Sequence, residues 1–228
     1  MQPLSLTLKG FRGIRDGRSY CSDGLSHLFD FEINGLGVGE KTGGSAANPG
    51  NGGALHITGN GRVTIERSSA VENSAANEGG ALWNHNSGEL TVINSTISGN
   101  SAPTGGGLFT QETATTRLLH VTIANNAVTG DGGGIQHGGT DAQLNLENSI
   151  VSDNTADGTG PDVNGSISAV ASIIFNPDGL EGPANNDGDG NFVGVFPNLA
   201  DIAYNGTSQT RFHAVSALPA LDNADETL

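Results

Sequence analysis

An apolar or small residue followed three positions later by asparagine recurs at five regularly spaced positions in this chain. The successive asparagines lie 27, 26, 28 and 22 residues apart. A near-constant period in the twenties is typical of a solenoid, in which each repeat forms one coil and stacks on its neighbours. We interpret these asparagines as structural: Asn73, Asn100, Asn126, Asn154 and Asn176.

The residues between the asparagines repeat as well. Four units align over residues 45–73, 74–100, 101–126 and 127–154, and a degenerate fifth follows over 155–176. Each of the four carries a glycine step, then an apolar residue, then a pair of residues two positions apart that share one face of a strand. The apolar column after the glycine step, which we expect to point inward, is Leu55, Leu82, Leu108 and Ile135.

This repeat unit predicts three short strands joined by corners at Gly and Asn, because both residues tolerate positive φ. The chain has 36 glycines and only 14% charged residues, which disfavours a helix-rich protein. Leucine-rich repeats share the period, but these units lack the several leucines that such repeats need. We predict an all-β, right-handed, single-stranded parallel β-helix of about five coils, with stacked asparagine amides and irregular caps.

Three segments follow from the repeat boundaries. We expect an N-terminal cap or foreign segment at residues 1–44, β-helix repeats at 45–176 and a C-terminal cap or tail at 177–228. The net charge of −15 opposes phosphate backbones and anionic lipid head groups, so nucleic acid is not an expected partner. No apolar stretch is long enough to span a membrane, and the first ten residues do not read as a signal peptide.

Several phrases of the repeat resemble known protein families. Residues 79–82 (GGAL) together with 97–100 (ISGN) resemble the paired signatures of chlamydial-type polymorphic outer-membrane proteins, although Ile replaces the usual Phe of FxxN. Residues 94–102 (NSTISGNSA) and the tail from Asn205 to Asp222 resemble phrases of bacterial secreted right-handed β-helix proteins. This resemblance covers residues 45–222 and implies a secreted or cell-surface β-solenoid, often adhesin-like.

Residues 1–33 do not follow the repeat. The segment from Leu4 to Gly17 resembles the opening strand of SMC/SbcC-like ATPases, which implies a following phosphate-binding loop. Glu40 separates Gly39 from Lys41, so the spacing of such a loop is not met. We therefore interpret this region as a cap over the first coil, or as a fused or miscalled gene start.

One outer stripe offers the best surface cluster for a ligand. The position after each inward apolar residue holds His56, Trp83, Phe109 or Gln136, and strand alternation places this column outside. Such a column either stacks on sugar rings or simply covers the coils. Together with the next column, it yields the candidate ligand-binding residues Trp83, Asn84, Phe109 and His137.

Catalysis on this fold would need convergent acidic and basic groups. Glu89 and Arg117 are the alternative catalytic candidates, and a surface ion pair explains them equally well. Asp187, Asp189 and Asn191 have a spacing that places oxygens around calcium, although Phe192 replaces the expected glycine. We expect no cofactor, with calcium at this loop as the alternative to an ordinary turn.

Three functions remain open from the residues. The leading hypothesis is a non-enzymatic, extracellular or bacterial cell-surface β-helix that acts as an adhesin-like binding or display module, with a glycan or a host-surface partner. The first alternative is a pectate-lyase-like polysaccharide lyase or a glycoside hydrolase that binds its glycan along one outer face. The second alternative is a structural spacer without a ligand.

Overall fold

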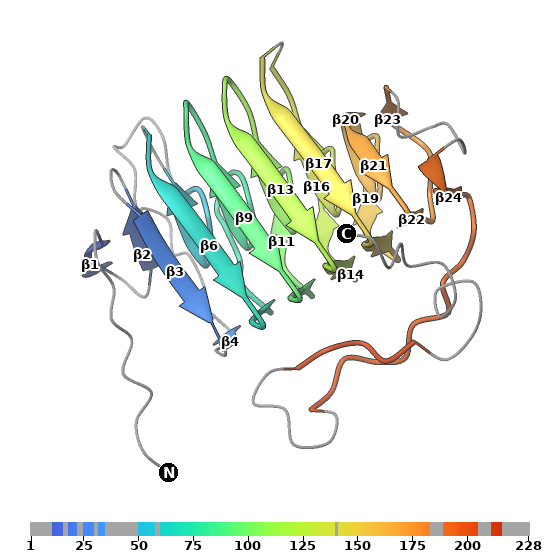
Figure 1. Cartoon of the computed structure of the whole chain (residues 1–228), viewed down its shortest axis with the longest axis horizontal. Helices are drawn as coiled ribbons and strands as arrows, with labels where there is room; N and C mark the ends of the chain where they lie inside the picture. The colour runs from blue at the N-terminus through green and yellow to red at the C-terminus, as the bar shows by residue number, and fades with distance from the viewer. Residues whose placement is uncertain are drawn as a thin grey trace.

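The computed structural model of this chain is an all-β solenoid (Figure 1). It describes residues 50–57, 60–139, 141–182, 189–204 and 211–215, together with the backbone of four strands before residue 50. Those four strands are β1 (Phe11–Arg15), β2 (Arg18–Cys21), β3 (Leu25–Phe29) and β4 (Glu32–Asn34). Within these ranges, no helix has the length and apolar character needed to cross a membrane.

Each regular coil contributes three principal strands. The first strands are β5 (Leu55–Ile57), β8 (Leu82–Asn84), β12 (Leu108–Thr110), β16 (Ile135–His137) and β20 (Val163–Ser166). The second strands are β6 (Arg62–Glu66), β9 (Glu89–Ile93), β13 (Thr115–Leu119), β17 (Gln143–Glu147) and β21 (Ser168–Val170). The third strands are β7 (Ser69–Val71), β10 (Thr96–Ser98), β14 (Thr122–Ala124), β18 (Ile150–Ser152) and β22 (Ile173–Ile174).

Five shorter strands complete the coils and the C-terminal end. A two-residue strand follows the third principal strand in three coils, as β11 (Ser101–Ala102), β15 (Ala127–Val128) and β19 (Thr155–Ala156). The C-terminal end carries β23 (Leu180–Glu181) and β24 (Phe192–Val193).

The strands stack into parallel sheets that run the length of the molecule. The first sheet has the order β1-β2-β5-β8-β12-β16-β20-β23, the second β21-β17-β13-β9-β6-β3, the third β24-β22-β18-β14-β10-β7-β4, and the small fourth sheet β11-β15-β19. Equivalent strands pair in parallel from coil to coil, whereas β1 pairs with β2 in antiparallel fashion. In Figure 1 the long strands β6, β9, β13 and β17 lie side by side in one such sheet. The predicted parallel β-helix is confirmed, with about four regular turns from β5 to β19.

The stacking begins earlier than the asparagine period. Strands β2, β3 and β4 pair in parallel with β5, β6 and β7, one in each of the three large sheets. Residues 18–34 therefore provide one more layer of strands before the first asparagine of the series. The antiparallel strand β1 covers the exposed edge of β2, which protects an edge that would otherwise pair with other chains.

The interior is a narrow apolar core built from the predicted columns. Leu55, Leu82, Leu108 and Ile135 are fully buried on successive coils, and Val63, Leu90 and Leu144 lie behind them. The glycine step permits this stacking. Gly79 has φ 67°, and a side chain on Gly80 would collide with the carbonyl oxygen of Gly106 on the next coil.

A ladder of buried asparagines connects the coils at one corner. The side-chain oxygen of Asn100 accepts hydrogen bonds from both the backbone N–H (2.9 Å) and the Nδ2 (3.0 Å) of Asn73. Asn126 accepts the same pair from Asn100, and Asn154 accepts the same pair from Asn126. The Nδ2 atoms of Asn100, Asn126 and Asn154 also donate to backbone carbonyls, as that of Asn126 does to Ile97 at 3.1 Å. Two donors per coil therefore converge on one acceptor, always in the same direction along the axis.

The left-handed residue of this corner is the one before each asparagine. Glu72, Gly99, Asn125 and Asp153 have φ values of 58°, 66°, 57° and 58°. The asparagines themselves are held by their amides and have ordinary backbone conformations. The expectation of Gly and Asn at positive φ thus holds for Gly99 and Asn125, whereas Glu72 and Asp153 take this position on the other coils.

Asn176 does not continue the ladder. Strand β22 pairs with β18 so that Ile174, and not Ile173, follows Val151 in its column. The fifth coil is thus one residue out of the predicted register, and Pro177 falls where the next asparagine would lie. The Oδ1 of Asn176 instead accepts a hydrogen bond from the backbone N–H of Asp178 at 2.9 Å.

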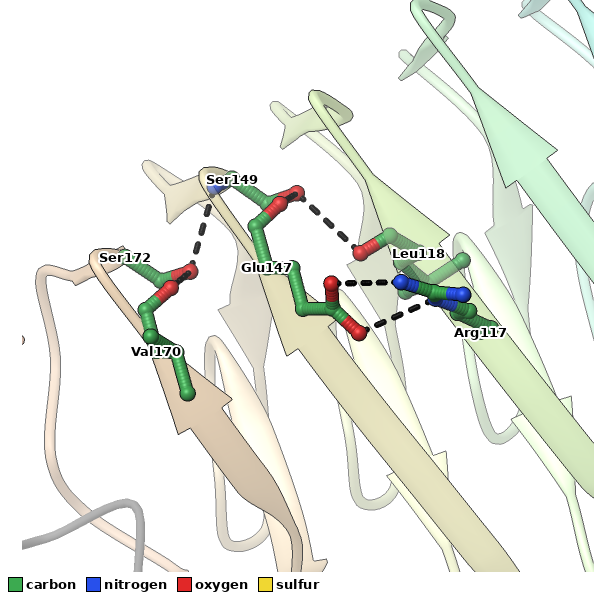
Figure 2. A network of polar contacts seen from close by, with 6 residues as sticks. All are labelled: Arg117, Leu118, Glu147, Ser149, Val170 and Ser172. Carbon is green, nitrogen blue, oxygen red and sulfur yellow. Dashed lines mark hydrogen bonds and ion pairs between the residues drawn. The ribbon is translucent and has the colours of Figure 1, made fainter. Parts of the chain in front are cut away.

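A second ladder, which the sequence analysis did not predict, lies at the corner between the second and third strands. The hydroxyl of Ser149 accepts the backbone N–H of Val121 and donates to the carbonyl of Glu147, and Ser172 repeats this pattern with Ser149 and Val170. Figure 2 shows Ser149 and Ser172 linked in this way. In the first coils the hydroxyl of Ser95 accepts the backbone N–H of Ser68 and donates to the carbonyl of Ile93, and the hydroxyl of Ser68 donates to the carbonyl of Glu66. The residue before each serine is left-handed, as in Arg67 and Asn148.

Replacing Asn126 by Ala is expected to destabilise the fold by about 3–5 kcal/mol, because it leaves two buried donors of Asn100 and the carbonyl of Ile97 without partners. The matched variant Asn176→Ala is expected to cost less than about 1 kcal/mol, because this asparagine is half-exposed. Urea unfolding followed by the fluorescence of Trp83 measures both. Equal losses of stability in the two variants would contradict the assignment of the ladder.

Candidate functional site

The predicted outer stripe forms a closed stack. His56, Trp83 and Phe109 lie opposite one another on β5, β8 and β12, as alternation predicts. The rings of His56 and Trp83 are 4.1 Å apart and nearly parallel, and Phe109 stacks on the other side of the indole at 6.5 Å. The indole also stacks on His85, two positions further along the chain, at 4.8 Å.

Trp83 and Phe109 were expected on the outer side of the sheet, either as a platform for sugar rings or as a cover for the coils, and there their rings are largely buried. Their exposed fractions are only 7% and 6%, because neighbouring rings stack on the indole and the glycine step lies close to the Cβ atoms of both residues. A sugar stacks on an open ring face, whereas in this stack neighbouring rings occupy the faces of the indole. The stack links three successive coils on the outer side of the first sheet.

Polar bonds fix the edge of the stack. The Nε1 of Trp83 donates to Glu78 at 2.9 Å, and the same carboxylate accepts a hydrogen bond from Asn51 at 3.2 Å. Further along the column the aromatic rings give way to amides, and Asn164 donates to Gln136 at 2.9 Å. The column thus changes from aromatic to amide stacking while its strand register stays the same.

Asn84 and His137 belong to the interior and not to the surface. They lie in one column with Thr110 between them, and their exposed fractions are 0% and 6%. Asn84 donates to the hydroxyl of Thr116 at 3.0 Å and to the carbonyl of Thr115 at 3.1 Å. The prediction of a surface cluster failed here because these residues directly follow the outward ones and therefore point inward.

The interior column leaves two acceptors without partners among the described residues, the Oδ1 of Asn84 and the Nδ1 of His137. Burial lowers the pKa of His137, and a hydrogen bond to the backbone of Ala142 opposes that shift. The lowered pKa favours the neutral form of this buried imidazole.

Glu89 and Arg117 do not form a pair. Arg117 binds Glu147 through two hydrogen bonds of 2.9 and 2.7 Å, as Figure 2 shows, and this partner raises its pKa. Glu89 binds Arg62 at 2.7 Å across the preceding pair of strands. The two candidates lie on adjacent strands, but each is held by a different partner.

The predicted calcium loop falls partly outside the described residues, where Asp187 lies. Asp189 is exposed, whereas Asn191 is buried and uses its amide within the fold. Its Oδ1 accepts the backbone N–H of Ser172 at 3.1 Å, and its Nδ2 donates to the carbonyl of Ala169 at 2.8 Å. Asn191 therefore extends the serine ladder. Within the described ranges, no three His, Cys, Asp or Glu side chains form a group that could hold a metal ion.

A buried carboxyl group ends the asparagine ladder. Asp162 accepts the backbone N–H and the Nδ2 of Asn154 through Oδ1, and the backbone N–H of Asn176 through Oδ2 at 2.7 Å. It occupies the column of Gly134, so its side chain reaches inward from the glycine step. A carboxylate has acceptors on both sides, whereas an asparagine in this place would direct its Nδ2 toward a donor.

A contact over 115 residues joins the C-terminal region to the third sheet. The hydroxyl of Ser98 and the Nε2 of His213 are 2.9 Å apart, and the Nδ1 of His213 donates to the carbonyl of Ala200 at 2.7 Å. A serine, a histidine and an orienting acceptor are also the elements of a nucleophilic site. Here Ser98 and His213 have exposed fractions of 1% and 5%, and the contact fastens residues 211–215 to the third sheet.

Stacked three-strand coils joined by parallel sheets define the class of parallel β-helix proteins. The family model for the right-handed β-helix region matches residues 44–193. This match covers well over half of the chain, and the protein belongs to the right-handed β-helix family. No curated protein and no solved structure gives a significant match.

Trp83→Ala is expected to reduce the free energy of unfolding by about 3–5 kcal/mol, because it opens a gap in the ring stack. Trp83→Phe retains an aromatic ring but loses the hydrogen bond to Glu78, at a cost of about 1–2 kcal/mol. Circular dichroism during urea unfolding measures both variants. A fully stable Trp83→Ala variant would show that the stack does not support the coils.

Asp162 is expected to make stability depend on pH. Burial raises its pKa to about 6, while the hydrogen bonds from Asn176 and Asn154 oppose this shift. The unfolded value is about 3.9, so the folded state binds the proton more tightly, and stability falls by up to about 3 kcal/mol as the pH rises from about 4 through 6.

Urea unfolding of the wild type and of Asp162→Asn at several pH values isolates this contribution. The difference in free energy of unfolding between the two proteins should change across that window. Parallel pH profiles would show that the carboxyl does not titrate there.

Proposed function

We propose that this protein is a non-enzymatic, secreted or cell-surface β-helix that serves as an adhesin-like binding or display module. The observation that carries this proposal is the pairing of charges on the outer face of the second sheet. Arg62 is paired with Glu89, and Arg117 with Glu147, each across neighbouring coils. These cations neutralise carboxylates within the surface itself, whereas a catalytic site needs them directed at a substrate.

The geometry of this face supports a surface role. Its central column carries Thr64, Thr91, Arg117 and Asn145 on consecutive strands, which gives a flat row of hydrogen-bonding groups. The adjacent column carries the half-buried Ile93 and Leu119. Such a face offers broad contacts to a glycan or to a host-surface protein.

The resemblance of residues 94–102 and of the GGAL and ISGN phrases to secreted β-helix proteins and polymorphic outer-membrane proteins supports the location. The charge of −15 disfavours nucleic acid as a partner. A lyase or a glycosidase would need the basic or acidic groups of Glu89 and Arg117 to converge, and each is engaged with a different partner. A spacer without a ligand would differ from a binding module by giving no signal on a glycan or host-protein array.

A screen of acidic and neutral polysaccharides for new reducing ends or unsaturated products tests the proposal. We expect no turnover above that of the Arg117→Ala variant, which removes the best available cation from an exposed ion pair at little cost in stability. Reproducible turnover by the wild type that disappears in Arg117→Ala would show that the protein is an enzyme.

A further inference from the structure

The small fourth sheet carries an open groove. It has a volume of about 430 Å³ and crosses the coils over β11, β15 and β19. The nearly buried side chains of Ala75, Ala102 and Val128 form its floor on three successive coils. Exposed residues at the positions before and after the floor residues form its two rims, among them Ala127 and Asp157.

The groups that line this groove restrict what it can bind. No aromatic side chain lines it, so it has no ring on which a sugar can stack. No Arg or Lys lines it either, and Asp157 is its one charged lining residue. Small side chains on the floor let a main chain approach closely, and the hydroxyls of Ser101, Thr129 and Thr155 offer it hydrogen bonds.

The charge balance around the groove is acidic. The four Arg side chains in the described part of the molecule, Arg62, Arg67, Arg117 and Arg211, form ion pairs with Glu89, Glu66, Glu147 and Glu72. Asp157 has no such pair with a described residue. Asp131 and Asp153, on the same coils, accept hydrogen bonds from uncharged groups of Thr159 and Ser152. The field at the groove therefore attracts a cationic ligand.

From the groove and this charge balance we infer that the groove over β11, β15 and β19 binds an extended, basic peptide segment with small side chains between its cations. The inference rests on the proposed binding role and names the partner class. The apolar floor receives the small residues, the rim hydroxyls bind the peptide backbone, and Asp157 pairs with a cationic side chain.

A short fluorescein-labelled peptide of alternating lysine and alanine is the probe, and fluorescence anisotropy measures its affinity for the intact chain. Ala127→Phe fills the groove and is expected to weaken binding about tenfold. Asp157→Asn is expected to weaken it a few fold and to reduce its dependence on salt. The matched controls Ser168→Phe, on the outer face of β21, and Asp141→Asn, outside the groove, are expected to leave affinity unchanged.

Three results would overturn the inference: full affinity in Ala127→Phe, an equal loss in Asp141→Asn and Asp157→Asn, or binding of a neutral oligosaccharide that competes with the peptide. The second of these would assign binding to net charge alone, and the third would assign the groove to a glycan. Thermal unfolding confirms that each variant is folded. Because polysaccharide turnover is measured separately, failure of peptide binding does not affect the test for enzymatic activity.

Discussion

The fold depends on buried pairs of hydrogen bonds in which two donors of one coil share a single acceptor oxygen on the next coil. Each ladder asparagine directs its backbone N–H and its Nδ2 to the same oxygen on the next coil, as Asn100 does to Asn126. Buried polar groups are costly unless they are paired, so this bond holds the corner in one arrangement. The apolar columns supply most of the burial, and the ladder determines where each coil turns.

Sequence periodicity was sufficient to predict the coils because inward residues and corner amides recur at a nearly constant interval. It failed where the interval changed. The shorter fifth coil moved Asn176 out of the column, and Asp162, which lies only eight residues after Asn154, took over as the last acceptor. Asp162 comes from a different part of its coil than the asparagines do. Its replacement of a ladder amide therefore leaves no periodic pattern in the sequence.

The candidate site was less predictable than the fold. Alternation correctly placed Trp83 and Phe109 on the outer side of the first sheet, but it does not show that stacked rings cover one another. The partners of Glu89 and Arg117 depended on side-chain reach between coils, and the Ser98–His213 contact joins segments 115 residues apart. The second contact involves residues 211–215, which lie outside the repeat.

The constant direction of the amide ladder also determines how this protein can change in length. Every interior asparagine of the ladder accepts two hydrogen bonds from one neighbouring coil and donates two to the other. In its ladder bonds, any such coil is therefore interchangeable with its neighbours. Removal of one whole repeat would bring Asn100 opposite Asn154 with donors and acceptor matched. The far end differs, because the carboxylate of Asp162 accepts hydrogen bonds from both Asn154 and Asn176 and donates none to a further coil. A solenoid of this kind can gain or lose whole repeats between its ends. A residue such as Asp162 can stand only at the end of the ladder that accepts hydrogen bonds.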